Sequence, residues 1–227
     1  MTSVTFLLMI VVFIATLGIQ FWLQRTYARY SRVANARGLT GAQVARTILD
    51  AHGLHGVRVE PVPGALTDHY DPMQKVVRLS EPNYASPSSA ALAVAAHEVG
   101  HAIQDAKGYA WLRVRAQLLP VANIGSMLGP WIFLLGMLMS FNETLMSVGI
   151  WLFGAAALFQ LVTLPVEFDA SNRALAILQR MNFLDNREMG GARAVLTAAA
   201  LTYVAALANS LATILHYVAI MQMAREE

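Results

Sequence analysis

The sequence predicts a mainly α-helical membrane protein with four transmembrane helices and a small α+β region in the cytoplasm. Of its 227 residues, 56% are hydrophobic and 13% are charged, and that charged share is about half of what soluble proteins carry. The hydrophobic residues gather in four long segments without charged residues, and nearly all Lys and Arg lie outside those segments. This composition excludes a wholly soluble fold and a disordered chain.

Other composition features limit the chemistry. The chain contains no cysteine, which excludes disulfide frameworks, thiolate metal sites and cysteine nucleophiles. Because cysteine is absent, any metal ion must be held by histidine and carboxylate side chains. A formal net charge of +2 is too small for a nucleic-acid surface, so we expect no nucleic-acid partner.

The first apolar segment, residues 4–23, contains 20 residues without a charge, which matches a bilayer core of about 30 Å. Arg25, Arg29, Arg32 and Arg37 follow it, and no basic region precedes it. This arrangement favours an uncleaved transmembrane helix over a cleaved signal peptide. The cytoplasm is expected at its C-terminal end.

Three further apolar segments follow. Residues 118–139 and 145–166 are separated only by SFNET, so they predict a transmembrane hairpin. Residues 194–223 exceed the length of one bilayer crossing, and the first turns of this helix are expected to stand outside the lipid. His216 within it is expected either to form a hydrogen bond between helices or to line a polar cavity.

The distribution of basic residues predicts the topology. Of the 16 Lys and Arg, 11 lie in residues 25–117 and four lie in residues 167–193, whereas SFNET contains none. Basic residues near membrane spans mark the cytoplasmic side. The sequence therefore predicts a multi-pass protein of the cell (inner) membrane, with residues 24–117 and 167–193 in the cytoplasm.

The first cytoplasmic region contains signals for helices and strands. Residues 38–53 have helical spacing of apolar side chains, with Thr40 as the N-cap and Gly53 beyond the end. Residues 56–62 and 74–80 alternate in the manner of strands, and turn-forming residues link them. They predict a β-hairpin or two short strands.

A helix over about residues 87–107 follows. Ser86 suits its N-cap, Pro87 its first position, and Gly108 its C-terminal cap. This helix contains His97, Glu98 and His101 in the sequence HEVGH.

The HExxH pattern is typical of zinc sites. Residues four apart share one helix face, so His97 and His101 can reach the same ion, and Glu98 can accept a proton from metal-bound water. The short pattern also arises by chance, and the alternative is a pair of exposed or hydrogen-bonded histidines on an ordinary helix. Burying three ionisable groups in an Ala-rich segment would be costly without a partner, which favours the metal.

A catalytic zinc ion needs a third protein ligand and an open position for water. Glu167 follows Pro165 at the expected cytoplasmic end of the third span, close to the membrane face where the HEVGH helix should also lie. Spacing alone equally permits a solvated acid at a helix N-terminus.

A family resemblance adds to these signals. The segments YDPMQKVVRLSEPNY, AHEVGHAIQ, LPVEFDASNRAL and LTAAALTYVAAL occur in this order over most of the chain. Together they resemble the YugP-like neutral zinc metallopeptidases of bacterial membranes, and the plan is similar to that of HtpX-type membrane proteases. The resemblance implies a zincin-like catalytic region that binds Zn²⁺ through His97, His101 and Glu167, with Glu98 as general base and acid.

One departure concerns the acid that supports the ligands. The HtpX-type pattern has an acid four residues beyond the ligand glutamate, whereas position 171 here is serine. Asp169 is the nearby acid and the candidate for this supporting role.

An oxyanion donor and a substrate-binding strand are also expected. The candidate donors are Tyr203 and His69, each with an alternative as a packing or turn residue. The strand around residues 76–79 is expected to pair with an extended substrate.

These observations predict a membrane-embedded zinc metalloprotease that cleaves a peptide, an unfolded protein or a membrane protein beside the lipid bilayer. A non-catalytic zinc-binding membrane scaffold is the non-enzymatic alternative. An intramembrane site-two-type protease would need HEVGH inside an apolar span, but the charged sequence QDAK follows it closely.

Overall fold

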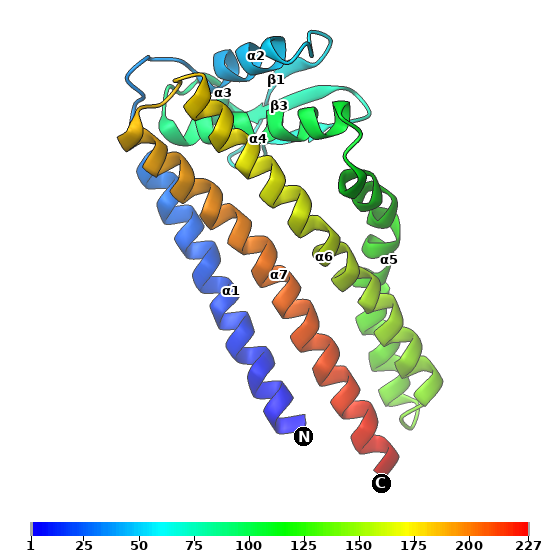
Figure 1. The fold of residues 1–227 in the computed structure, drawn as a ribbon. Coiled ribbons are helices and arrows are strands. Elements are labelled where there is room, and N and C mark those ends of the chain that lie inside the picture. Colours follow the sequence, from blue (N-terminus) through cyan, green and yellow to red (C-terminus); the bar gives the residue numbers. More distant parts are fainter. Residues whose placement is uncertain (1, 227) are drawn as a thin grey trace. The chain divides into compact units, whose positions relative to one another are not determined.

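The computed structural model describes residues 2–226 and is drawn in Figure 1. Its elements in chain order are α1 (Thr2–Tyr30), α2 (Gly41–Ala51), β1 (Arg58–Val62), β2 (His69–Asp71), β3 (Val76–Ser80), α3 (Glu81–Ala85), α4 (Ser89–Ala106), α5 (Ala110–Leu138), α6 (Glu143–Arg180) and α7 (Asn186–Glu226).

Within residues 2–226, four helices are long and apolar enough to cross a membrane, namely α1, α5, α6 and α7. The mainly α-helical membrane fold with a small α+β region is therefore confirmed. The expected spans lie within these four helices, except that α5 ends at Leu138, one residue before the expected end at 139. The helices are longer than the spans, since α6 continues past Pro165 to Arg180 and α7 begins at Asn186. Where the lipid begins and ends along these helices stays a prediction.

The chain divides into two compact units. The helical unit contains the described residues up to Gln20, Arg113–Leu164 and the residues from Leu201 on. The mixed unit contains Phe21–Leu112 and Pro165–Ala200. The chain passes between the units once within each long helix.

In the helical unit, α5 and α6 approach each other closely through glycines. A Cβ atom added to Gly125 would overlap the carbonyl oxygen of Leu152, and one added to Gly129 would lie 2.8 Å from the nitrogen of Phe153. Small residues permit such close backbone contact between membrane helices. The expected helical hairpin is present.

Polar contacts in the helical unit show which helix ends lie together. Thr5 Oγ1 on α1 lies 3.0 Å from His216 Nδ1 on α7, which confirms the expected hydrogen bond between helices. Arg225 Nη2 at the end of α7 donates to Glu143 Oε2 at the start of α6, at 2.8 Å. The first turns of α1, the α5–α6 turn and the last turns of α7 thus lie at one end of this unit.

The mixed unit contains a three-stranded sheet in the order β1-β3-β2. The two short strands expected from residues 56–62 and 74–80 are present as β1 and β3. They pair in parallel, with Arg58 opposite Val76, so the alternative of a hairpin between them is wrong. The reason is that the linking segment contains a strand of its own. β2 pairs antiparallel with β3, with His69 opposite Arg78, and forms the hairpin in place of β1.

Helix ends in the mixed unit follow capping rules. Thr40 and Gln43 form a capping box at α2, as the sequence predicts. α4 begins two residues later than expected, because Ser88 Oγ accepts from Ala91 N, and Ser86 instead ends the short helix α3. Gly108, with a φ of 63°, follows the end of α4.

The core of the mixed unit surrounds α4. Buried apolar side chains from α2, β3, α4, α6 and α7 form one cluster that includes Val44, Ile48, Val77, Leu79, Leu92, Val99, Leu178 and Leu196. This packing fixes α4 between α2 and the sheet on one side and α6 on another. The HEVGH segment thus lies inside the core.

Candidate metal site

The HEVGH segment is enclosed by the mixed unit. Glu98 and His101 are 8% and 7% exposed, and the side chain of His97 is 13% exposed. Burial of three ionisable side chains on one helix costs free energy unless they have charged or hydrogen-bonding partners. The alternative of two exposed histidines is therefore wrong, whereas both histidines do have hydrogen-bond partners.

Gly100 lets α4 approach α6. A Cβ atom at this position would lie 2.8 Å from the carbonyl oxygen of Ala170, closer than real Cβ contacts allow. The close approach places Glu167, which is 2% exposed, beside the two histidines. The alternative of a solvated acid at a helix N-terminus is therefore wrong, because Glu167 lies within α6 and is buried.

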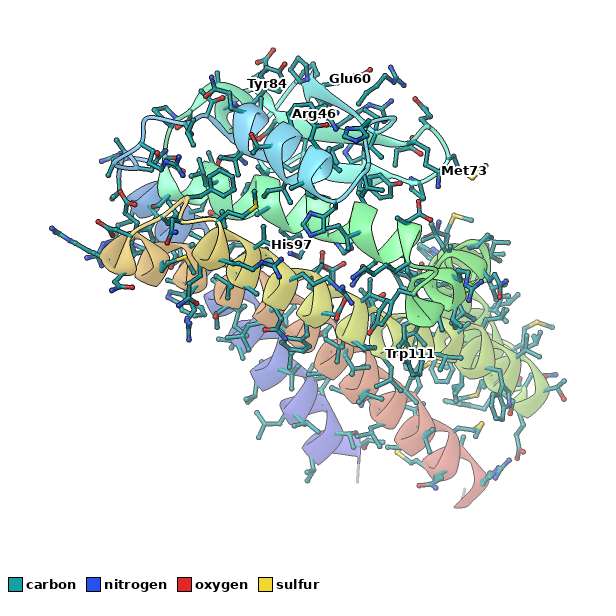
Figure 2. All side chains as sticks on the ribbon, turned by 45° about the horizontal axis from the view of Figure 1, so that its top comes forward. Arg46, Glu60, Met73, Tyr84, His97 and Trp111 are labelled. Carbon is teal, nitrogen blue, oxygen red and sulfur yellow. The ribbon has the colours of Figure 1, made fainter. Side chains whose placement is uncertain are left out.

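Three side chains from the two helices converge. His97 Nε2 and His101 Nε2 lie 3.2 and 3.7 Å from Glu167 Oε2, and Figure 2 shows His97 beside α6. One ligand atom from each residue lies within 4.8 Å of the others. Two imidazole nitrogens and a carboxylate oxygen form a donor set suited to zinc with an open position, so these residues could hold the ion.

The other nitrogen of each histidine has a partner. His97 Nδ1 lies 3.1 Å from Ser171 Oγ, and His101 Nδ1 lies 2.9 Å from Gln104 Oε1. Metal-binding histidines are commonly held in this way through the nitrogen that does not face the metal. Neither partner is predicted from the sequence, although Ser171 follows Glu167 by four residues and Gln104 follows His101 by three.

Asp169 contacts the site through Gln104. Gln104 Nε2 donates to Asp169 Oδ2 and to the carbonyl oxygen of Val166, at 2.8 Å each. Arg173 Nη2 donates to Asp169 Oδ1 at 3.1 Å. Asp169 therefore contacts Gln104, which in turn contacts the candidate ligand His101, and its supporting role stays a prediction.

Glu98 lies in an environment that favours its protonated form. Burial raises the pKa of Glu98 above its ordinary value, the neighbouring histidines lower it, and the charges of Glu167 and Asp68 raise it further. A carboxyl group with a raised pKa in an enclosed site suits proton transfer.

The two candidate oxyanion donors lie in different places. His69 is exposed on β2, and its Nδ1 lies 2.8 Å from the carbonyl oxygen of Thr67. Tyr203 lies on α7 in the helical unit, whereas the three candidate ligands lie in the mixed unit. Their roles as oxyanion donors stay predictions.

Asp68, which the sequence analysis did not single out, precedes β2. It accepts hydrogen bonds from Ser80 N and Asn83 Nδ2, at 2.8 and 2.9 Å. This network connects the start of β2 to the beginning of α3. Its charge is one of those that act on Glu98.

The expected pairing of a substrate with residues 76–79 is contradicted by the sheet order. β3 is the central strand and pairs with β1 on one side and β2 on the other. Its backbone groups are therefore engaged within the sheet, and the outer strands are β1 and β2.

Comparisons with known proteins agree with a metal site. The family described as "Putative neutral zinc metallopeptidase" matches residues 5–222. The chain is also similar to the "Putative membrane protease YugP" of Bacillus subtilis (strain 168), with 49% identity over 225 residues that cover 97% of this chain and 100% of that protein. No solved structure matches this chain.

Proposed function

The chain belongs to the putative neutral zinc metallopeptidase family, and from that premise we propose that it hydrolyses peptide bonds at a zinc ion held by His97, His101 and Glu167. The observation that carries the proposal is the convergence of three ligand atoms within 4.8 Å of one another, from two helices of one buried core. Glu98, next to His97 on α4, is the proposed general base.

The residues of the site have different proposed roles in hydrolysis. A zinc ion held by His97, His101 and Glu167 would polarise a water molecule and the substrate carbonyl group. The carboxylate of Glu98 would accept a proton from the attacking water and later donate it to the leaving amine. Ser171 and Gln104 hold the two imidazole rings with their Nε2 atoms toward Glu167.

We place this site at the cytoplasmic face of the inner membrane. The support is the concentration of basic residues in 25–117 and 167–193, the two regions that flank the membrane spans on one side. Basic residues near spans favour the cytoplasm. The substrate is then a peptide, an unfolded protein or an exposed part of a membrane protein.

Two other functions share the HEVGH motif or its zinc ligands. A site-two-type intramembrane protease would carry HEVGH on a membrane span, but α4 is not among the four spanning candidates and packs against α2 and the sheet. A zinc-binding scaffold without turnover would have the same ligands. Turnover therefore decides between a scaffold and a peptidase.

The Glu98→Gln variant provides this test. The amide keeps the shape of Glu98 but cannot take up the proton, so we expect cleavage of casein by the purified full chain to fall at least about 100-fold. Bound zinc, measured by metal analysis, should remain. His97→Ala is the matched control that should lose both zinc and cleavage. Undiminished cleavage by Glu98→Gln would contradict the proposed mechanism.

A further inference from the structure

We infer that Gln104 is a positioning residue that fixes which nitrogen of His101 carries the proton, through a hydrogen-bond chain that runs from Arg173 to Asp169 to Gln104 to His101. The inference rests on the proposed function, because it concerns how the chain prepares one of the proposed zinc ligands.

The orientation of the Gln104 amide follows from its partners. Its Nε2 lies 2.8 Å from the carbonyl oxygen of Val166 and 2.8 Å from Asp169 Oδ2. A carbonyl oxygen cannot donate, and an Asp169 carboxylate paired with Arg173 is also an acceptor. Rotating the amide would bring two acceptors against an acceptor. The nitrogen must therefore face Val166 and Asp169, and the oxygen must face His101.

The state of His101 follows in turn. An amide oxygen only accepts, so His101 Nδ1, at 2.9 Å, must be the donor and carry a proton. A neutral imidazole then has its lone pair on Nε2, the nitrogen that faces Glu167. Of the two neutral forms of His101, the chain thus favours the one that can bind a metal ion through Nε2.

The burial of Gln104 means that its amide must keep these hydrogen bonds. Its side chain is fully buried, with 0% exposure, so water cannot replace a lost partner and an unmade hydrogen bond there would be costly. A neutral amide also suits the site, which already has carboxylates at Glu98, Glu167 and Asp169. A further negative charge at position 104 would repel the carboxylate of Asp169.

His97 is held differently. Its partner, Ser171 Oγ at 3.1 Å, is a hydroxyl group that can donate or accept by rotating. Ser171 therefore orients the His97 ring without choosing its protonated nitrogen. Of the two histidines, only His101 has a partner, Gln104, that determines which ring nitrogen carries the proton.

The first test is the affinity for zinc. Gln104→Met keeps the length of the side chain but removes the amide oxygen and the amide nitrogen, so we expect the full chain in detergent to bind zinc about 10- to 100-fold more weakly in competition with a chelator. Gln179→Met, on the exposed surface of α6, is the matched control and should bind like the wild type. Wild-type affinity in Gln104→Met would overturn the inference.

A second pair of variants separates positioning from packing. Gln104→Glu retains an acceptor for His101 but sets a carboxylate against Asp169, so zinc affinity should fall. Adding Asp169→Asn restores a donor between the two side chains and should recover part of the loss. A purely structural role predicts no recovery, because the double variant also loses the ion pair with Arg173.

Nitrogen-15 NMR of the zinc-free wild-type chain reads the protonated nitrogen directly. We expect the Nδ1–H form of His101, and a predominant Nε2–H form would overturn the inference even if no Gln104 variant folded. His101→Ala tells the two proposals apart. Full zinc affinity in His101→Ala would refute the proposed site, whereas its loss there beside unchanged binding in Gln104→Met would refute only the role of Gln104.

Discussion

The buried carboxyl group of Glu98 in the candidate site lowers the stability of the folded chain. Glu98 is buried and has a raised pKa, chiefly because burial disfavours its ionised form. A carboxyl group whose pKa is higher in the folded chain than in the unfolded chain lowers stability as pH rises between those two values. Above the higher value the penalty is complete, and below the lower one it is absent.

Replacing Glu98 should therefore stabilise the zinc-free protein. Glu98→Gln removes the ionisable group, so we expect a higher melting temperature than the wild type at pH 8 and a smaller difference at pH 5. Thermal denaturation after treatment with a chelator measures both. Equal melting temperatures at pH 8 would show that the Glu98 carboxyl costs nothing in the folded chain.

Glu167 should contribute to zinc binding through its charge. Glu167→Gln preserves the shape of the side chain but replaces an anionic ligand with a neutral amide, and we expect zinc affinity to fall more than about 100-fold, since the loss of a ligand should exceed that of a supporting partner. Glu188→Gln is a suitable control, because Glu188 is also buried in the mixed unit but accepts from Ala36 N. Similar zinc affinity in the two variants would remove Glu167 from the ligand set.

The sequence was sufficient to select the three side chains that converge, because helical spacing joins His97 to His101 and the family resemblance adds Glu167. It did not select Gln104 or Ser171. Both are common residue types whose importance arises only when α4 and α6 lie against each other. Ser171 is 74 residues from its partner His97 in the chain. Gln104 is only three residues from His101, but the partners that orient its amide, Val166 and Asp169, are 62 and 65 residues away.

At the level of elements, the contact between α4 and α6 depends on Gly100. In an exposed helix, replacing glycine with alanine stabilises by about 1 kcal/mol. Here the added Cβ would lie 2.8 Å from the backbone oxygen of Ala170, so α4 and α6 must separate and the histidines must move from Glu167.

We therefore expect Gly100→Ala to lower both the melting temperature and the zinc affinity. Gly190→Ala on α7, where nothing lies within 4 Å of an added Cβ, is the control and should leave both unchanged or raise the melting temperature. Calorimetry and chelator competition measure the two quantities. Normal zinc affinity in Gly100→Ala would mean that the site does not need the close helix contact.

The strands show a different limit of sequence analysis. Alternation in residues 56–62 and 74–80 correctly indicated strands, because it reports which side chains are buried locally. It carries no information about the partner of each strand. The three-residue strand β2, inside a segment rich in turn formers, has too few residues to show alternation, yet it changes the connection from β1 to β3 from a hairpin to a parallel pairing.

At the level of the whole molecule, hydrophobic length was enough to predict four membrane helices, because crossing a bilayer requires about 20 apolar residues. It did not predict how far the helices continue beyond the apolar segments. α6 runs through Pro165 to Arg180, so one helix contributes both to the helical unit and, through Glu167, to the candidate site. The orientation in the membrane still depends on the positive-inside rule.

Cysteine labelling can test this orientation, because the chain contains no cysteine and the wild type is a natural blank. Met73 is 90% exposed in the β2–β3 turn (Figure 2), and Asn142 lies in the exposed α5–α6 turn. The chain between them contains one spanning candidate, α5. The two positions should therefore lie on opposite sides of the membrane.

With a membrane-impermeant maleimide, we expect Asn142→Cys to be labelled in intact spheroplasts and Met73→Cys only after permeabilisation. Labelling of Met73→Cys alone in intact spheroplasts would reverse the orientation, and labelling of both would remove α5 as a span. Neither result would alter zinc binding by the purified chain, because all proposed ligands lie in the mixed unit. The experiment therefore tests where substrates must come from, independently of the chemistry that cleaves them.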